Sequence, residues 1–262
     1  MSNSVVLNMD CLEYMRTLPD NYFDLCVADP PYGAGLTEGG GCQGWFSKNH
    51  QDACSQSVNV ERAEPKQPLR FHGGDRWNKY IHDRPSEENG RGVGEEVRKK
   101  IIAWDVAPRK EYFEQIFRIS RNQIIWGGNY FELPPTRCFL VWRKLTISES
   151  FSMAMAEYAW TSFNTNAKVF EAAPQGKRGD ERFHPTQKPV ELYAWIFNLF
   201  AEKGQKIFDP YLGSGSSRIA AWNAGIDFIG CEIDKTYFEK QEKRFLQQTA
   251  QINIFQAEQL SF

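Results

Sequence analysis

The fold is decided by residues 23–33, whose sequence is FDLCVADPPYG. The first six residues are mostly apolar, which predicts a buried strand of a parallel sheet. Pro30 and Pro31 then end the strand, because a proline has no N–H with which to continue the ladder. A carboxylate, two rigid residues and an aromatic ring therefore follow the end of a central strand. In open α/β sheets this edge is where ligands bind.

The residues after the strand have complementary chemistry. Asp29 can accept hydrogen bonds, the carbonyls of Pro30 and Pro31 lie on a backbone of fixed φ, and Tyr32 offers a flat face. Together they predict a receptor for a planar group that carries an amine. The alternative is an ordinary Pro-Pro turn, in which Asp29 is a turn or cap residue and Tyr32 packs at the rim.

Composition limits the class of protein. The 262 residues, 41% of them hydrophobic, suffice for one large α/β domain or for one domain with a sizeable insertion. The net charge of −2 means that any nucleic-acid face must be a local patch. No run approaches the ~18 apolar residues of a membrane span, and the first residues lack the features of a signal peptide. We therefore expect a soluble, cytoplasmic protein.

The six cysteines are scattered and form no CxxC pair. Cys26 and Cys231 lie in apolar runs, which predicts core thiols in a reducing compartment. A zinc site would have to draw on four residues, Cys42, His50, Cys54 and His72. Their spacing matches no zinc module, so no metal is expected.

A second element with ligand-binding character lies near the C-terminus. Lys206–Asp209 reads as a strand, residues 210–217 as a tight glycine-rich loop, Arg218–Ala224 as a helix that Gly225 caps, and Phe228–Cys231 as the next strand. Glu232 ends that strand, nineteen residues after Gly213. This layout is typical of a site for an adenosine cofactor, with the acid on the ribose.

The loop is neither GxGxxG nor a P-loop, which favours a cofactor with a ribose and no phosphate, such as S-adenosylmethionine. In this interpretation Gly213 and Gly215 let the backbone approach the ligand closely. The alternative is a glycine turn with a satisfied Glu232.

The rest of the chain alternates between strands and helices. Strands are predicted at Val5–Asp10, Gln123–Trp126, Cys138–Trp142 and Met153–Trp160, and helices at Leu12–Leu18, at Arg109–Ser120 and from Pro189 onward. Strand, helix and strand within the first thirty residues form a βαβ unit, whose strands should be parallel.

Two stretches interrupt this alternation. Residues 35–100 are rich in glycine and in mixed charges, with five aromatic residues among them. Because cations meet phosphates and rings meet bases, this predicts an insertion over the site that contacts nucleic acid. The alternative is a solvated, variable loop, since the charges balance. Residues 161–183 are polar and turn-rich and are predicted to form a surface loop.

With both elements placed, the chain resembles the β group of DNA amino-methyltransferases. Residues 29–32, DPPY, match the family's (D/N/S)PP(Y/F/W) motif, and residues 209–216, DPYLGSGS, match its cofactor loop. Residues 184–189, HPTQKP, look like the segment before that loop in the permuted subgroup whose catalytic motif comes first. The resemblance covers residues 5–32 and about 104–248.

The resemblance implies an α/β, Rossmann-like class I methyltransferase fold with a mostly parallel, seven-stranded sheet in permuted order. Residues 1–262 would form a single methyltransferase domain. Within it, residues 35–100 are a large insertion, a candidate lid or DNA-contacting region, and residues 161–183 are a candidate target-recognition loop.

The resemblance also assigns roles to residues. The implied catalytic residues are Asp29, Pro30, Pro31 and Tyr32. Asp29 and the Pro30 carbonyl would hold the exocyclic amine, and Tyr32 would stack on the base. The implied cofactor-binding residues are Asp10, Thr186, Lys188, Asp209, Gly213, Ser214, Gly215 and Glu232. Among these, Glu232 would bind the ribose, Asp10 the adenine, and Thr186 with Lys188 the methionine carboxylate.

The implied reaction is methyl transfer from S-adenosylmethionine to N6 of a flipped adenine in double-stranded DNA, because DPPY in this family points to adenine and SPPY to cytosine N4. The alternatives are an N4-cytosine methyltransferase, a methyltransferase for RNA or for a protein side-chain amide, a catalytically silent nucleic-acid-binding relative, and a nucleotide-dependent oxidoreductase. A homodimer and a separate cognate restriction endonuclease stay open as partners, and no membrane is expected.

Overall fold

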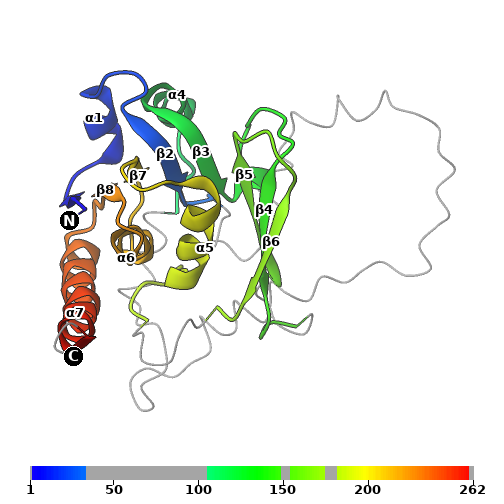
Figure 1. Ribbon diagram of the computed structural model, residues 1–262. Helices are drawn as coiled ribbons and strands as arrows, with labels where there is room; N and C mark the ends of the chain where they lie inside the picture. Colours follow the sequence, from blue (N-terminus) through cyan, green and yellow to red (C-terminus); the bar gives the residue numbers. More distant parts are fainter. Residues whose placement is uncertain (1, 34–104, 149–153, 175–181, 260–262) are drawn as a thin grey trace, which may run out of the picture. The chain divides into compact units, whose positions relative to one another are not determined.

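The computed structural model describes residues 2–33, 105–148, 154–174 and 182–259 (Figure 1). The chain divides into two compact units. The first comprises Met1–Pro30, Pro108–Ile147 and Met155–Phe262, and the second comprises Pro31–Ala107 and Ser148–Ala154. The first unit contains all the helices and strands of the described residues. The 35–100 insertion and the four residues considered for zinc lie outside the described residues.

Eight strands form one sheet in the first unit. They are β1 (Ser4–Leu7), β2 (Phe23–Ala28), β3 (Ser120–Trp126), β4 (Phe139–Lys144), β5 (Ala156–Thr161), β6 (Lys168–Ala172), β7 (Lys206–Asp209) and β8 (Asp227–Cys231). Their order across the sheet is β1-β8-β7-β2-β3-β5-β4-β6. The first five strands in this order (β1, β8, β7, β2 and β3) are parallel to one another. Strand β5 is antiparallel to both of its neighbours, and β6 is parallel to β4. The prediction of a mostly parallel α/β sheet is confirmed.

In the described part of the chain, the sheet is accompanied by five α-helices: α1 (Cys11–Arg16), α4 (Lys110–Ile119), α5 (Val190–Phe200), α6 (Ser216–Asn223) and α7 (Lys235–Gln259). A 3₁₀ turn, η2 (Gly128–Tyr130), follows β3. Each predicted helix of the described residues is present, with bounds that differ by a few residues. Pro189 is the N-cap residue of α5 rather than its first helical residue. Gly225, at φ 69°, has the predicted left-handed conformation.

The two faces of the sheet are buried by different helices, because successive side chains of a strand point to opposite sides. Leu25 and Val27 of β2 face a cluster that includes buried residues of α5 and α6. Cys26 and Ala28 face a second cluster, with buried residues of α1 and α4. Helices therefore cover both faces of β2, in the arrangement drawn in Figure 1.

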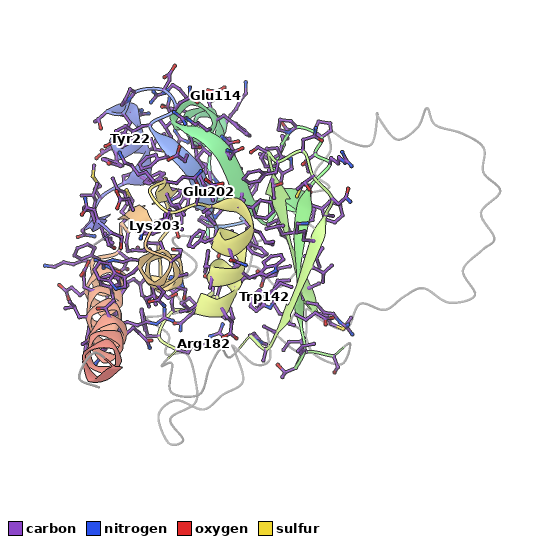
Figure 2. The ribbon with its side chains drawn as sticks, viewed as in Figure 1. Tyr22, Glu114, Trp142, Arg182, Glu202 and Lys203 are labelled. Carbon is purple, nitrogen blue, oxygen red and sulfur yellow. The ribbon has the colours of Figure 1, made fainter. Side chains whose placement is uncertain are left out.

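The sheet has one strand more than the predicted seven, and the prediction of a surface loop at 161–183 is wrong over β6. This strand pairs with β4 from Leu140↔Lys168 to Lys144↔Ala172. Its inward residue Phe170 packs against Trp195 of α5, with ring centroids 5.2 Å apart. Trp142 of β4 lies between that strand and α5 (Figure 2) and donates to the Ala172 carbonyl. The outward positions of this five-residue edge strand are Val169 and Glu171, so apolar and polar residues do not alternate and the pattern does not reveal a strand.

Two features are absent from the described residues. None of their helices is long and apolar enough to cross a membrane. No group of three or more His, Cys, Asp or Glu side chains among them could hold a metal ion.

Strands β2 and β7 are packed together through a buried aromatic pair. Phe208 of β7 is fully buried, and its ring stacks on Phe23 with centroids 4.8 Å apart. We expect Phe208→Ala to lower the free energy of unfolding by about 3–5 kcal/mol, because it leaves a cavity between packed layers. The measurement is urea unfolding followed by circular dichroism. Val169→Ala, at an exposed position of β6, should change it by less than about 0.5 kcal/mol. Equal losses in the two variants would contradict this packing.

Candidate active site

The topology brings the two predicted site elements to one edge of the sheet. Strands β2 and β7 are parallel neighbours, with Leu25 opposite Ile207 and Cys26 opposite Phe208. Parallel neighbours end at the same edge, so Asp29 after β2 and the 210–215 loop after β7 leave the sheet side by side. Strand β8, which Glu232 follows, is the next neighbour of β7.

Lys188 connects these elements directly. Its ammonium pairs with the Asp29 carboxylate, and its Nζ lies 3.2 Å from Glu157 Oε2. Its main-chain carbonyl accepts a hydrogen bond of 2.7 Å from Ser216 Oγ, in the first turn of α6. The three segments that the sequence singled out separately, around residues 29, 188 and 213, are therefore joined through one buried lysine.

Glu157 and Lys144 extend this contact into a buried network of charges. Lys144 Nζ lies 2.5 Å from Glu157 Oε1, and the side chains of Lys144 and Lys188 are almost fully buried. Burial opposes the charge of Glu157, but the two ammonium groups outweigh it and lower the pKa of Glu157 to about 2. Burial likewise opposes the charge of Lys188, but Asp29 and Glu157 outweigh it and raise the pKa of Lys188.

Sequence reasoning missed Glu157 and Lys144. Glu157 lies within the predicted strand Met153–Trp160, where a single ionisable residue usually points to solvent, and Lys144 lies two residues beyond the predicted strand Cys138–Trp142. Their one signal is the antiparallel pairing of β4 with β5, which places Trp142 opposite Glu157 and so brings Lys144 near it. That pairing is non-local and is not visible in either strand alone.

The 210–215 loop is held by Glu232. One carboxylate oxygen accepts the Gly213 N–H at 2.8 Å, and the other accepts the Asp234 N–H at 2.8 Å. Burial raises the pKa of Glu232, and the two main-chain donors act against this rise. The predicted ribose acid therefore also fixes the conformation of the glycine loop.

Both loop glycines have left-handed backbones, with φ 53° at Gly213 and 75° at Gly215. A Cβ on Gly213 would lie 3.2 Å from the His184 ring, and one on Gly215 would lie 3.1 Å from Gln241 Oε1. The structure thus gives two reasons for these glycines, their positive φ and the close packing of His184 and Gln241. Close approach to a ligand, the predicted reason, stays a prediction.

Asp209 fastens the loop to the following helix. Its Oδ1 accepts the Tyr211 N–H at 3.0 Å and its Oδ2 accepts Ser217 Oγ–H at 2.5 Å. The residue is only 2% exposed, and burial raises its pKa to about 7, against these two hydrogen bonds and with support from Asp29 and Glu232. Asp209 therefore helps to fix the conformation of the loop.

Ser214 and Ser216 share a partner that the sequence did not reveal. Arg244 of α7 is buried and donates to the Ser214 carbonyl at 2.7 Å and to Ser216 Oγ at 3.0 Å. The two serine hydroxyls lie 3.2 Å apart. An arginine within a helix gives no local signal of this contact.

The HPTQKP segment lies against the same loop. The His184 ring meets the Tyr237 ring edge-on, with centroids 4.4 Å apart, and Thr186 Oγ1 lies 3.3 Å from His184 Nδ1. Burial, together with the neighbouring cations Lys188 and Arg182, lowers the pKa of His184 to about 4. Thr186 itself is exposed.

The remaining predicted residues lie at the boundaries of elements. Asp10 is the N-cap of α1, and its Oδ1 accepts the Leu12 N–H at 2.6 Å. Pro30 ends a segment of the first unit, while Pro31 and Tyr32 belong to the second. Within the second unit, Gly33 N–H donates to Asp105 Oδ1 at 3.1 Å.

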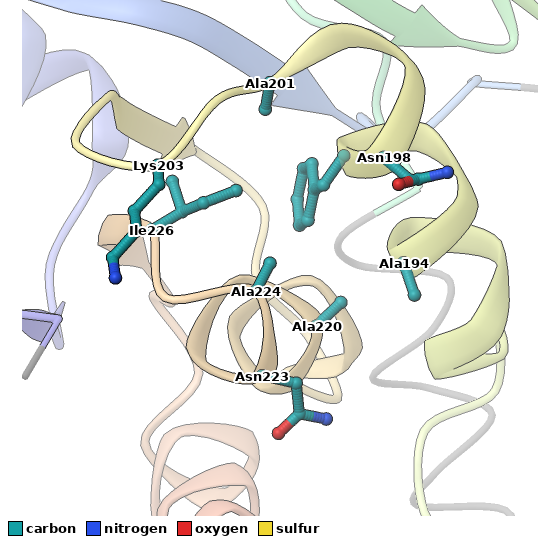
Figure 3. Close-up of a pocket in the computed structure, with 9 residues that line it drawn as sticks. Ala194, Asn198, Ala201, Lys203, Ala220, Asn223, Ala224 and Ile226 are labelled. Carbon is teal, nitrogen blue, oxygen red and sulfur yellow. The ribbon is translucent and has the colours of Figure 1, made fainter.

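A groove of about 390 Å³ lies between α5 and α6 (Figure 3). Its walls are mostly apolar and small, including Ala194, Ala220 and Ala224, with Lys203 at one end. None of the predicted site residues lines it. The groove is therefore separate from the charged edge where Asp29 and Lys188 meet.

Comparison with known proteins identifies the class. The family model N6_N4_Mtase, described as DNA methylase, matches residues 42–243, which is most of the chain. The chain therefore belongs to this DNA methylase family. The match includes the HPTQKP segment, the glycine loop and Glu232, and it begins after the DPPY motif.

The chain is also similar to particular proteins. Type II methyltransferase M2.MboI of Moraxella bovis is 26% identical over 251 residues, which span 90% of this chain and 85% of that one. The solved M1.HpyAVI–SAM complex is 16% identical, with a TM-score of 0.48 over 92% of this chain and 98% of that one. The cytosine-N4-specific PvuII DNA methyltransferase is 12% identical, with a TM-score of 0.49 over 94% and 87%. These TM-scores are low, so the architecture rests on this chain's own sheet.

Asp209 should make stability depend on pH. Its pKa is raised on folding, so the folded state binds more protons than the unfolded state between about pH 4 and pH 7, and stability falls as the pH rises through that window. Asp209→Asn removes this contribution. The variant should gain stability relative to the wild type as the pH rises, on the order of a few kcal/mol by pH 8.

The measurement is urea unfolding at several pH values. Asp20→Asn is the matched control, because the Asp20 side chain is 71% exposed. A constant stability difference between Asp209→Asn and the wild type across this range would show that the buried carboxylate is not the titrating group.

Proposed function

We propose that this protein transfers a methyl group from S-adenosylmethionine to N6 of an adenine flipped out of double-stranded DNA. The observation that carries the proposal is the junction at Lys188, which touches Asp29 and binds the first turn of α6 after the glycine loop. Membership of the DNA methylase family supports methylation of DNA, and the DPPY form of the motif favours adenine. The relative M2.MboI, by its name a Type II methyltransferase, supports the same class of reaction.

The residues around the glycine loop fit such a cofactor. Each oxygen of the buried Glu232 accepts one main-chain N–H, so each retains capacity to accept a ribose hydroxyl. When bound, S-adenosylmethionine supplies an activated methyl group on its sulfonium. The proposed contacts are those expected from the motif: Asp10, Thr186, Lys188, Asp209, Gly213, Ser214, Gly215 and Glu232.

Asp29 and the Pro30 carbonyl are proposed to receive the substrate. An aniline-like amine is a poor nucleophile, because its lone pair is delocalised into the ring. Hydrogen bonds from its two protons to these acceptors favour a pyramidal nitrogen and expose the lone pair. Positive charge then develops on the nitrogen, where a carboxylate and a carbonyl dipole stabilise it.

The target base must leave the duplex to reach these groups, which costs a few kcal/mol of unstacking. Tyr32 is proposed to offset this cost by stacking on the base, with Pro31 fixing the backbone before it. The reaction would take place in the cytoplasm of a prokaryotic or phage-infected cell. A homodimer and a separate restriction endonuclease remain predictions from the family resemblance.

Asp29→Ala should greatly slow methyl transfer and leave cofactor binding intact. We expect the transfer rate to fall by a factor on the order of 100–1000, because the variant lacks the main acceptor for the developing charge. The measurements are tritium transfer from labelled S-adenosylmethionine to DNA and calorimetric titration of the cofactor. Asp20→Ala, which removes an exposed carboxylate, is the control. Near-normal turnover in Asp29→Ala would show that the catalytic assignment is wrong.

The identity of the methylated base decides between the two reactions that the family name covers. Digestion of methylated DNA, followed by mass spectrometry of the nucleosides, should yield N6-methyladenine. N4-methylcytosine would establish the alternative instead. Long-read mapping of DNA from cells that express the protein would then give the sequence context of each modified base.

A further inference from the structure

Four ionisable side chains form a continuous series of alternating charge in the first unit. Lys144 of β4 pairs with Glu157 of β5, Glu157 with Lys188 before α5, and Lys188 with Asp29 after β2. The proposed reaction uses the last two of these residues. Lys144 and Glu157 have as yet no role in it.

Because these side chains are largely buried, the loss of any one charge should affect the others. The side chains of Lys144 and Lys188 are 6% and 4% exposed, and those of Glu157 and Asp29 are 23% and 15% exposed. A buried ammonium needs a carboxylate partner, and Glu157 is shared by both lysines. The four formal charges sum to zero, so loss of the Glu157 charge alone would leave the series with an excess positive charge.

We propose that Glu157 is a positioning residue for methyl transfer: it draws the Lys188 ammonium away from full engagement with Asp29, so that the Asp29 carboxylate keeps acceptor capacity for the substrate amine. The proposal deepens the proposed function and rests on it. Its physical basis is that Lys188 Nζ lies close to both carboxylates and closer to Asp29, so the electrostatic attraction of Glu157 at 3.2 Å opposes the attraction of Asp29.

Changes at the two unassigned residues should therefore have opposite effects on Asp29. Glu157→Gln keeps the shape of the side chain but removes its charge, so Lys188 acts on Asp29 alone and Asp29 holds its charge to lower pH. Lys144→Met leaves Glu157 with Lys188 as its one remaining partner among these groups. Lys188 then interacts more with Glu157 and less with Asp29. Because the Asp29 carboxylate is less stabilised, it should take up a proton at higher pH.

Other ionisable groups lie around this series and stay unchanged in both variants. Those that influence its members electrostatically are Arg182, His184, Tyr193 and Asp209. Because they are common to both variants, opposite shifts in the two cannot arise from them.

The experiment compares wild-type protein with Glu157→Gln, Lys144→Met and the control Glu171→Gln. Glu171 lies on β6 and pairs with Arg143 at 2.7 Å, with both side chains exposed. Single-turnover methyl transfer to duplex DNA is measured at saturating S-adenosylmethionine across a range of pH. The Asp29 carboxyl is titrated by carbon NMR in the same proteins, with its signal assigned from Asp29→Asn.

We expect Glu157→Gln to slow transfer about 10–100-fold with little change in cofactor affinity. Its Asp29 titration and the acid limb of its rate profile should move to lower pH. Both should move to higher pH in Lys144→Met, which keeps the proposal testable if Glu157→Gln does not fold. Glu171→Gln should match the wild type.

Three results would overturn the proposal: rates and titration in Glu157→Gln that equal those of Glu171→Gln, a shift of the same sign in both network variants, or weaker cofactor binding with an unchanged rate at saturation. The last would show that Glu157 acts on cofactor binding and not on Asp29. A wild-type protein that binds the cofactor but methylates no DNA would overturn the proposed function. The NMR titration would still report whether Glu157 controls Asp29.

Discussion

The structure depends on where the ammonium group of Lys188 can lie. A buried cation must be paired, and the partners that Lys188 finds are carboxylates from two different strand ends of the sheet. The same residue binds Ser216 through its main-chain carbonyl, so its position is coupled to the start of α6. Three segments that are far apart in the sequence thereby share one polar junction.

The polar groups of the glycine loop are likewise paired with other groups of the protein. Its main-chain and hydroxyl groups are bonded to Glu232, to Asp209 and to Arg244, each from a different element. A loop held in this way is preorganised, because its conformation does not have to be selected when a ligand arrives. Glu232, at the end of β8, supports the loop and also offers the acceptors expected for a ribose.

Much of this architecture could be predicted from local pattern. The strand before Asp29, the βαβ unit and the strand–loop–helix around Gly213 follow from apolar runs and their breakers, and the structure confirms them. The buried thiols Cys26 and Cys231 are confirmed as core residues. Strand β6 was missed, because its apolar and polar residues do not alternate and a short edge strand is stabilised by its partner rather than by its own sequence.

The sequence by itself determined which chemical groups follow the strand ends, since prolines, glycines and acids mark those positions whatever lies around them. Only the tertiary structure decided how the groups are paired. The contacts of Glu157 with Lys144 and Lys188, and of Arg244 with the glycine loop, join residues whose sequence neighbourhoods say nothing of one another. The physical reason is that burial removes water from these charges, and the only partners then available are those that the fold brings within reach.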